Sequence, residues 1–345
     1  MKAAIIGATG YGGADLIRIL HNHPEVEVVS VHSSSQAGDE YIHSYVHMQD
    51  VINFQLEDID AEKIAEKADL VFMATPSGIS STLTPRMIEA GLKVIDLSGD
   101  LRIKNLEDYK QWYKKTPAPQ EVVDKAVYGL PEWYKEEVSQ ADVVANPGCY
   151  PTAVLLGLAP LIQQNKINPK SLVIDAKSAV SGAGRSPSPI AHFPEMNDNF
   201  RIYKVNQHQH IPEIEQMLSN WHGEQTPISF STHLVPMTRG IMATMYAEAN
   251  DRTSAEQLHE LYLSTYENAP FVRVRPLGMF PSTKEVYSSN YCDIGITYDE
   301  RTNRVMVVSV IDNLMKGAAG QAVQNLNIMM GIDEKTGLDF LPVYP

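Results

Sequence analysis

Two segments of the chain hold residues whose types and spacing could carry out covalent chemistry. In the first, ANPGCYPTA (145–153), Cys149 stands between two prolines and ahead of an apolar run. Pro151 suits the first position of a helix, where its missing N–H costs nothing. The pattern therefore predicts that Cys149 lies just ahead of a helix start, where N–H groups and the dipole stabilise a thiolate and a developing oxyanion. We predict that Cys149 is a nucleophile, and that Cys292, in a strand-like run, is a small buried residue.

A thiol nucleophile needs a base, and HQHIPE (208–213) offers candidates. His208 and His210 precede Pro212 and Glu213, another predicted helix start, and an extended H-x-H spacing places both rings on one side. A metal pair completed by Glu213 is one alternative, but no third histidine or cysteine stands nearby, so we expect no metal. Capping or packing at the helix start remains open for one of the two. Because a lowered thiol pKa also lowers nucleophilicity, the histidine is expected to act mainly in proton transfer.

The opening residues, IIGATGYGGADL, follow a strand pattern and lead into a helix pattern. Gly7, Gly10 and Gly13 have the spacing G-x-x-G-x-x-G, which lets backbone approach a pyrophosphate at a helix N-terminus. A tight turn without a ligand is the alternative, but the strand–helix context favours nucleotide binding.

The second strand ends in VHSSSQ (31–36), without the Asp or Glu that holds the ribose 2′-hydroxyl of NAD. His32 and the small hydroxyls of Ser33 and Ser34 stand there instead and leave room for a 2′-phosphate. The sequence therefore favours NADP over NAD.

Two arginines are placed where an anionic substrate could be held. Arg102 follows the strand in DLSGDLR, at the strand end where ligands of open α/β sheets bind, and Arg185 ends the glycine loop SGAGR. Either could clamp a carboxylate or phosphate with its forked guanidinium, although a solvated surface arginine is the alternative for each.

The elements that must position these residues fall into two patterns. Before Cys149, buried strand patterns at 2–8, 26–33, 69–76, 93–98 and 141–147 alternate with helix patterns at 14–22 and 78–91, which indicates a parallel doubly wound sheet. Residues 102–140 interrupt this alternation as a helical excursion.

After Cys149 the spacing changes. A helix is expected over 152–164, kinked or ended by Pro160. Strand patterns follow at 171–182, 228–237, 240–250, 271–276, 291–299 and 304–312, with a helix over 253–268. They predict an α+β domain with a mainly antiparallel sheet. A last helix, 314–331, is expected to pack back onto the first domain.

Composition excludes several classes of protein. The 345 residues carry a formal net charge of −14, which argues against nucleic acid or an anionic membrane as the main partner. No apolar run approaches the roughly 20 residues that span a bilayer. Two cysteines are too few for a disulfide framework, which favours the reducing cytoplasm.

Eight segments together resemble one family, the N-acetyl-gamma-glutamyl-phosphate reductases of arginine biosynthesis, within the aspartate-semialdehyde dehydrogenase superfamily. They occur in the family's order: GATGYGG (7–13), ATPSG (74–78), DLSGDLR (96–102), YGLPE (128–132), NPGCYPT (146–152), SGAGR (181–185), HQHIPEIEQ (208–216) and DNLMKGAAGQAVQN (312–325). The family often has an arginine near the end of the second strand, where this chain has serines.

The resemblance implies a Rossmann-type domain over 1–148 and 313–345, and a catalytic and oligomerisation domain over 149–312. It implies Cys149 and His208 as catalytic residues, with Arg102, Arg185, His210 and Glu213 at the substrate. The implied contacts to NADP are Gly7, Thr9, Gly10, Tyr11, Gly12, Gly13, Ser33, Ser34, Pro76, Ser77, Ser181, Gly182, Asn313, Lys316 and Gly317.

The reaction implied is reduction of an acyl phosphate, N-acetyl-glutamyl 5-phosphate, through a cysteine thioester, with NADPH as hydride donor and the histidine exchanging the proton. A homo-oligomer, dimer or tetramer, is expected. Aspartate-semialdehyde dehydrogenase, a reductase of carrier-linked aminoadipyl phosphate, and a non-catalytic nucleotide sensor on the same fold are the alternatives.

Overall fold

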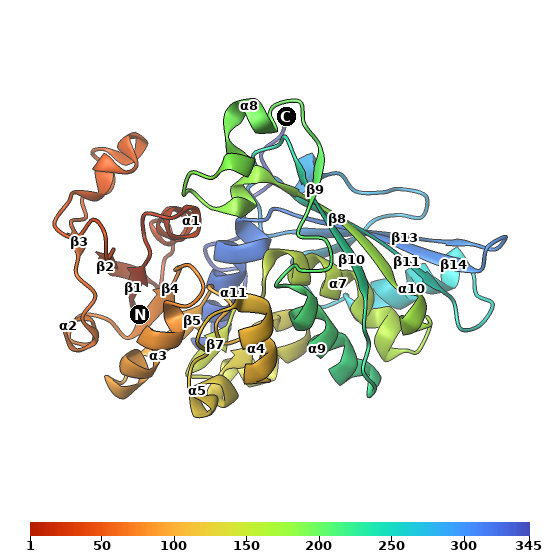
Figure 1. Ribbon diagram of the computed structural model, residues 1–345, viewed down its shortest axis with the longest axis horizontal. Helices are drawn as coiled ribbons and strands as arrows, with labels where there is room; N and C mark the ends of the chain where they lie inside the picture. The colour runs from red at the N-terminus through yellow and green to blue at the C-terminus, as the bar shows by residue number, and fades with distance from the viewer. The chain divides into compact units, whose positions relative to one another are not determined.

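The computed structural model describes residues 1–345, and the chain divides into two compact units (Figure 1). Unit 1 comprises Met1–Pro147 and Ala318–Asp339, and unit 2 comprises Gly148–Gly317 and Phe340–Pro345. Gly148 and residues 313–317 and 340–345, which the sequence prediction assigned to the first domain, lie in unit 2.

Unit 1 is built on a seven-stranded parallel sheet. Its strands are β1 (Lys2–Ile6), β2 (Glu27–His32), β3 (Leu56–Glu57), β4 (Leu70–Met73), β5 (Lys93–Asp96), β6 (Val127–Tyr128) and β7 (Val143–Ala145). Their order, β3-β2-β1-β4-β5-β7-β6, reverses direction at β1, as in nucleotide-binding sheets. The predicted parallel sheet is confirmed, and the two-residue strands β3 and β6 at its edges are additional.

The helices of unit 1 cover this sheet because its central strands are apolar on both faces. All four residues of β4, for example, are fully buried. The helices are α1 (Tyr11–Leu20), α2 (Ala61–Ala65), α3 (Ser80–Glu89), α4 (Leu106–Tyr113), α5 (Gln120–Lys125), α6 (Pro131–Ser139) and α11 (Gly320–Met329), with single 3₁₀ turns η1 (Tyr41–His43) and η2 (Val46–Met48). The excursion at 102–140 is helical, as predicted, since it contains α4, α5 and α6.

Helix α11 returns late in the sequence to unit 1, where it packs against α1 and α6. Its polar side chains are buried, and they hydrogen-bond to the turn after β6. Gln321 Nε2 and Asn325 Nδ2 both donate to Gly129 O, at 2.8 and 2.9 Å, and Asn325 Nδ2 also donates to Asn146 Oδ1 at 3.0 Å. The amides therefore specify where α11 lies, and the predicted return of the last helix is confirmed.

Unit 2 is built on a second seven-stranded sheet. Its strands are β8 (Val173–Ala179), β9 (Arg201–Tyr203), β10 (Ser229–Val235), β11 (Ile241–Glu248), β12 (Val272–Val274), β13 (Cys292–Asp299) and β14 (Arg304–Ile311). The order is β12-β13-β14-β11-β8-β10-β9, in which only the β8–β10 and β12–β13 pairs are parallel. The predicted, mainly antiparallel sheet is confirmed.

The helices of unit 2 are α7 (Cys149–Gln163), α8 (Phe193–Met196), α9 (Ile211–His222) and α10 (Ala255–Thr265), with short 3₁₀ turns at η3 (Pro169–Ser171), η4 (Val180–Ala183), η5 (Pro189–Ala191) and η6 (Thr283–Val286). Helix α7 packs against β11, β14 and α9. It continues past Pro160 to Gln163, so Pro160 does not end it. A five-residue π-helical turn, η7 (Met315–Ala319), follows β14.

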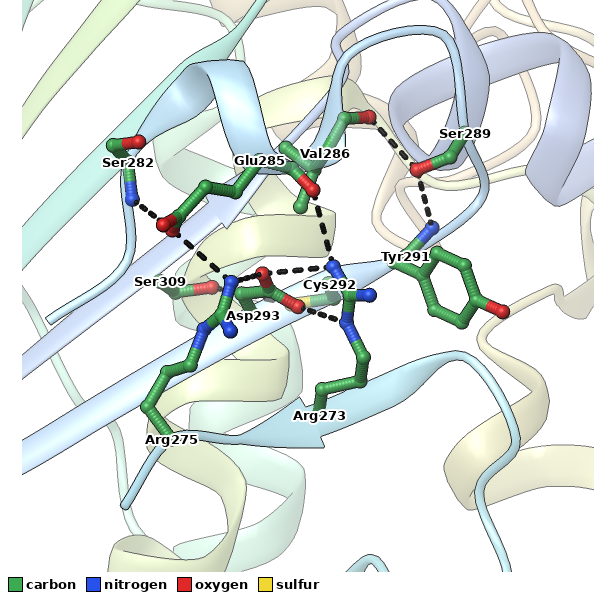
Figure 2. A network of polar contacts seen from close by, with 10 residues as sticks. All are labelled: Arg273, Arg275, Ser282, Glu285, Val286, Ser289, Tyr291, Cys292, Asp293 and Ser309. Carbon is green, nitrogen blue, oxygen red and sulfur yellow. Dashed lines mark hydrogen bonds and ion pairs between the residues drawn. The ribbon is translucent and has the colours of Figure 1, made fainter. Parts of the chain in front are cut away.

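A buried carboxylate fixes the edge of this sheet near β12 and β13 (Figure 2). Asp293 is fully buried, and Arg273 binds both of its oxygens through Nε and Nη2, at 2.6 and 2.9 Å. Arg275 Nη2 donates to the same carboxylate and to Glu285 Oε2, the latter at 3.0 Å. The Arg273 guanidinium also lies over the Tyr291 ring, 4.1 Å from its centroid. The loop that carries Glu285 is therefore tied to β13 by paired charges.

Candidate active site

Cys149 is the first residue of α7, and Gly148 is its N-cap, with extended backbone (φ −67°, ψ 156°). The helix therefore begins two residues earlier than Pro151 suggested. Gly148 has no side chain to cap the helix, and the first-turn N–H groups of a helix have no acceptor within it. The Cys149 thiol thus lies at the positive end of a helix, where a thiolate is stabilised.

The peptide groups on both sides of Gly148 are held in place. Gly148 N donates to Glu213 Oε1 at 2.8 Å, and Gly148 O accepts from the N and Oγ1 of Thr152 at 2.9 and 3.0 Å. Glu213 is fully buried in the first turn of α9. The sequence prediction placed Glu213 at the substrate, but in the structure its carboxylate binds the backbone next to Cys149.

Gly317, in the π-helical turn η7, lies directly against Cys149. A Cβ at this position would be 2.8 Å from Cys149 Cβ and 3.2 Å from its Cα. Any residue larger than glycine would displace Cys149.

His208 is surrounded by aromatic rings. The rings of Tyr150, Tyr203 and Phe230 meet it edge-on, with centroids 5.3 to 5.8 Å away. Only 3% of its surface is exposed, and burial, with a smaller effect of Lys204, lowers its pKa to about 3.

Both ring nitrogens of His208 have hydrogen-bond partners. His210 N donates to Nδ1 at 3.2 Å, so the proton of the neutral ring is assigned to Nε2, which lies 3.4 Å from Tyr203 Oη. Tyr203 in turn donates to Tyr150 Oη at 3.2 Å, and Tyr150 donates to the carbonyl of His233 at 3.2 Å. The ring is therefore buried with hydrogen-bond partners at both nitrogens, and the role of His208 in proton exchange stays a prediction.

His210 is the N-cap residue of α9 and is 8% exposed. The H-x-H segment is not an extended strand as predicted, since β9 ends at Tyr203 and the chain turns into α9. The turn nevertheless brings the two rings together, 4.7 Å apart, and places His210 6.0 Å from the Tyr150 ring. Both histidines lie beside Tyr150, the residue after Cys149, and His210 is the more exposed of the two.

Three other predicted residues of unit 2 turn their side chains inward. Asn313 donates to Ser181 Oγ at 2.9 Å and accepts from Gly240 N at 2.8 Å. Lys316 is fully buried, with Nζ 5.7 Å from the centroid of the Phe271 ring. These side chains shape the loops after β8 and β14. Gly182 and Arg185 are exposed in the loop that follows Ser181.

In unit 1, the glycine-rich turn joins β1 to α1, and α1 begins at Tyr11 with Gly10 as an N-cap that has no side chain. Gly7 has φ +84°, and a Cβ there would lie 2.3 Å from Ala74 O. Two tyrosines brace the turn: Tyr41 donates to Ala8 O at 3.4 Å and Tyr45 to Thr9 O at 3.1 Å. Sequence reasoning missed both tyrosines, since nothing in the sequence of residues 41–48 signals this contact.

The residues that follow β2 differ in their access to a ligand. His32 is buried, with Nδ1 at 2.9 Å from Asp58 O and Nε2 at 2.9 Å from Ser30 Oγ, and burial lowers its pKa. Ser33 is also buried, while Ser34 is exposed. Of the two serines expected at the cofactor, only Ser34 presents its hydroxyl to solvent.

The loops after β4 and β5 are tied to each other. Ser77, which follows Pro76, donates through Oγ to Ser98 O at 2.9 Å. Arg102 is 5% exposed, and its Nε and Nη2 donate to Asn146 O and Leu97 O at 2.7 and 2.8 Å. Two of the five N–H groups of its guanidinium thus bind backbone carbonyls and support these loops, and its contact with the substrate stays a prediction.

No group of three or more His, Cys, Asp or Glu side chains is arranged to hold a metal ion. None of the helices is both long and apolar enough to cross a membrane.

Comparison with known proteins first defines the class. Residues 2–141 match the family model "Semialdehyde dehydrogenase, NAD binding domain", and residues 149–313 match "Semialdehyde dehydrogenase, dimerisation domain". Aspartate semialdehyde dehydrogenase II of Vibrio cholerae, in complex with ASA, has the same fold, with a TM-score of 0.72, 17% identity, and coverage of 96% of this chain and 98% of that one.

Full-length relatives narrow the class to one enzyme. The chain is 59% identical to the N-acetyl-gamma-glutamyl-phosphate reductase of Bacillus cytotoxicus and 58% identical to that of Geobacillus sp., over 100% of each chain. The chain therefore belongs to the N-acetyl-gamma-glutamyl-phosphate reductase family and is an oxidoreductase, as its motifs indicated.

Proposed function

We propose that the protein catalyses the NADPH-dependent reduction of N-acetyl-glutamyl 5-phosphate to the 5-semialdehyde and phosphate, in arginine biosynthesis. The observation that carries this proposal is Cys149 at the first position of α7, with its backbone fixed by Glu213 and Thr152. The relatives that match over their full length are named for this reaction.

Covalent catalysis begins at Cys149. The thiolate attacks the acyl carbon of the substrate, a thioester forms, and inorganic phosphate leaves. The N–H groups of the first turn of α7 stabilise the negative oxygen in each tetrahedral state. When the sulfur leaves the reduced carbon, the aldehyde is released and the thiolate returns.

We assign proton exchange to His210. It accepts the thiol proton before attack and returns it at the end of the cycle. His208, with its pKa of about 3 and both nitrogens bound, keeps His210 in place through the hydrogen bond from His210 N. Arg185, exposed in the loop after Ser181, remains our candidate for holding the substrate's anionic groups.

Unit 1 fits a dinucleotide. The cap at Gly10 carries no side chain, and no atom lies within 4 Å of a Cβ built on Gly12, so the start of α1 can accept a pyrophosphate. Gly7, Thr9, Gly10 and Tyr11 would hold the phosphates, and Ser34 would face the ribose. When bound, NADPH supplies the hydride that reduces the thioester.

The absence of an acidic residue after β2 favours NADP over NAD, and Ser34 offers a direct test. Ser34→Asp should shift the ratio of kcat/KM from NADPH toward NADH, because a carboxylate repels the 2′-phosphate. Steady-state rates with both cofactors measure the shift. Better use of NADH by the unmodified protein would contradict the assignment.

We also infer a homo-oligomer and a cytoplasmic location. The dimerisation-domain match supports the first, and the low cysteine content, two in 345 residues, supports the second.

Phosphate-dependent NADPH formation, measured with N-acetylglutamate semialdehyde and with aspartate semialdehyde side by side, tests the function. A higher kcat/KM for the acetylated substrate supports it. A preference for aspartate semialdehyde, or no turnover of either, overturns it.

A further inference from the structure

The buried carboxylate of Glu213 binds a backbone N–H group beside Cys149. Its side chain is fully buried in α9, yet its Oε1 accepts from Gly148 N, which belongs to the residue before the nucleophile. In a capping box the N–H of the N-cap residue is accepted by a Glu or Gln at the third position of the same helix. That position is Pro151 in α7, and the acceptor for Gly148 N comes instead from a different helix, α9.

The contacts around Gly148 determine where the next N–H group points. The Gly148 carbonyl is directed into α7, toward the N and Oγ1 of Thr152. Because a trans peptide is planar, the N–H of Cys149 on the same peptide points the opposite way, out of the helix start. That N–H is a donor for the oxyanion. With Gly148 N held by Glu213, the peptide planes before and after Gly148 are both fixed.

The charge of Glu213 acts in the same place. A carboxylate that is hydrogen-bonded to the residue before Cys149 disfavours formation of the thiolate, in opposition to the helix dipole. A less stabilised thiolate is a better nucleophile once formed, because nucleophilicity falls as the thiol pKa falls.

We propose that Glu213 is a positioning residue of the reductase: it orients the oxyanion-binding backbone at Cys149 through Gly148 N, and its charge moderates the acidity of the Cys149 thiol. This role rests on the proposed function only in naming the reaction. It differs from the substrate contact expected from the sequence.

Glu215 supplies a matched control. It lies two residues further along α9, and its Oε1 accepts from Ile228 N at 3.0 Å, the same type of bond made away from Cys149. The experiment compares Glu213→Gln, Glu213→Ala and Glu215→Gln with the full-length wild-type enzyme. Three quantities are measured: kcat, KM for NADPH, and the pH profile of Cys149 alkylation by iodoacetamide.

Glu213→Ala should lower kcat by about 10²- to 10³-fold, the usual loss when an oxyanion donor is misplaced, with KM for NADPH changed less than about twofold. Glu213→Gln keeps an acceptor for Gly148 N, so it should retain kcat within about tenfold. It should also shift the alkylation midpoint to lower pH, because the nearby negative charge is gone. Glu215→Gln should change neither quantity.

The proposal is overturned if Glu213→Ala keeps normal kcat, or if Glu213→Gln loses as much kcat as Glu213→Ala without a shifted alkylation profile. The second result would make the carboxylate itself a proton carrier. If circular dichroism shows that Glu213→Ala does not fold, the comparison of Glu213→Gln with Glu215→Gln decides: equal alkylation midpoints refute the proposal. Alkylation requires no substrate, so the absence of acyl-phosphate reduction in the wild type would refute the proposed function separately.

Discussion

The burial of His208 predicts a specific dependence of stability on pH. In the folded protein its pKa is lowered to about 3 by burial, whereas in the unfolded chain an imidazole has a pKa of about 6.5. Between these values the unfolded chain binds a proton that the folded chain does not. The stability contributed by the neutral ring is therefore complete above pH 6.5 and is lost progressively as the pH falls toward 3.

The size of the stability loss follows from how far the pH falls below the unfolded pKa of about 6.5. Each pH unit within the window lowers the free energy of unfolding by about 1.4 kcal/mol, so acidification from pH 7.5 to 5.0 costs about 2 kcal/mol through this residue alone. His208→Asn removes the titrating ring and keeps an oxygen that can accept from His210 N. The variant should be less stable at pH 7.5, yet it should lose about 2 kcal/mol less than the wild type between the two pH values.

Urea unfolding at pH 7.5 and 5.0 measures the effect. Trp221 is the only tryptophan in unit 2, so its fluorescence, with Trp112 and Trp133 replaced by Phe, reports the unfolding of that unit.

In the activity assay, His208→Asn should lower kcat less than His210→Asn, for which a loss of about 10²- to 10⁴-fold is expected. If the variant and the wild type lose the same free energy of unfolding between pH 7.5 and 5.0, His208 is not a buried neutral ring. If His208→Asn lowers kcat more than His210→Asn does, the proton-transfer role belongs to His208.

Three further predictions concern the two cysteines, the glycine that contacts Cys149, and the buried carboxylate of β13. Cys149→Ser should abolish acyl-phosphate reduction while NADPH still binds, as judged by cofactor fluorescence, whereas Cys292→Ser should keep most activity; inactivation by Cys292→Ser alone would contradict this. Gly317→Ala, whose Cβ would lie 2.8 Å from Cys149 Cβ, should lower kcat by on the order of 10²-fold, because the sulfur is displaced. An unchanged kcat would show that the π-helical turn moves to accommodate the added methyl group without displacing Cys149. Asp293→Asn should destabilise unit 2 by about 3–5 kcal/mol in thermal unfolding, because Arg273 and Arg275 lose the buried negative charge that they share. Asp299→Asn, at the far end of the same strand, should change the stability little, and equal effects of the two substitutions would contradict the prediction.

The sequence predicted the elements well because their signals are local. Apolar runs bounded by glycine and proline indicated all the longer strands, and the G-x-x-G-x-x-G spacing indicated the turn into α1. Short elements such as β3, β6 and β9 were missed, and Pro160 does not end α7, because the surrounding apolar residues are buried almost without interruption and packing maintains the helix across it.

The candidate site was predicted in part. Residue types indicated Cys149 as a candidate nucleophile and the two neighbouring histidines, but the contacts of each residue come from partners that are distant in the sequence. Arg102 was expected at an anion, and its fork binds Asn146 O and Leu97 O. His208 was expected to exchange protons, and the rings of Tyr150, Tyr203 and Phe230 enclose it. These contacts depend on tertiary packing, which no spacing within HQHIPE reveals.

The late return of α11 has a consequence for synthesis of the chain. Unit 1 is not complete when residue 147 leaves the ribosome, since α11 and the amides that bind Gly129 O are translated only after residue 317. The 170 residues of the intervening segment 148–317 must emerge first. At about 5–20 residues per second this takes roughly 10–35 seconds, during which the nascent parallel sheet lacks one of its covering helices. Apolar strands that stay exposed are prone to aggregate in that interval. Once α11 is made, its hydrogen bonds to Gly129 O and Asn146 favour one docked position, because an amide buried elsewhere would lose these partners.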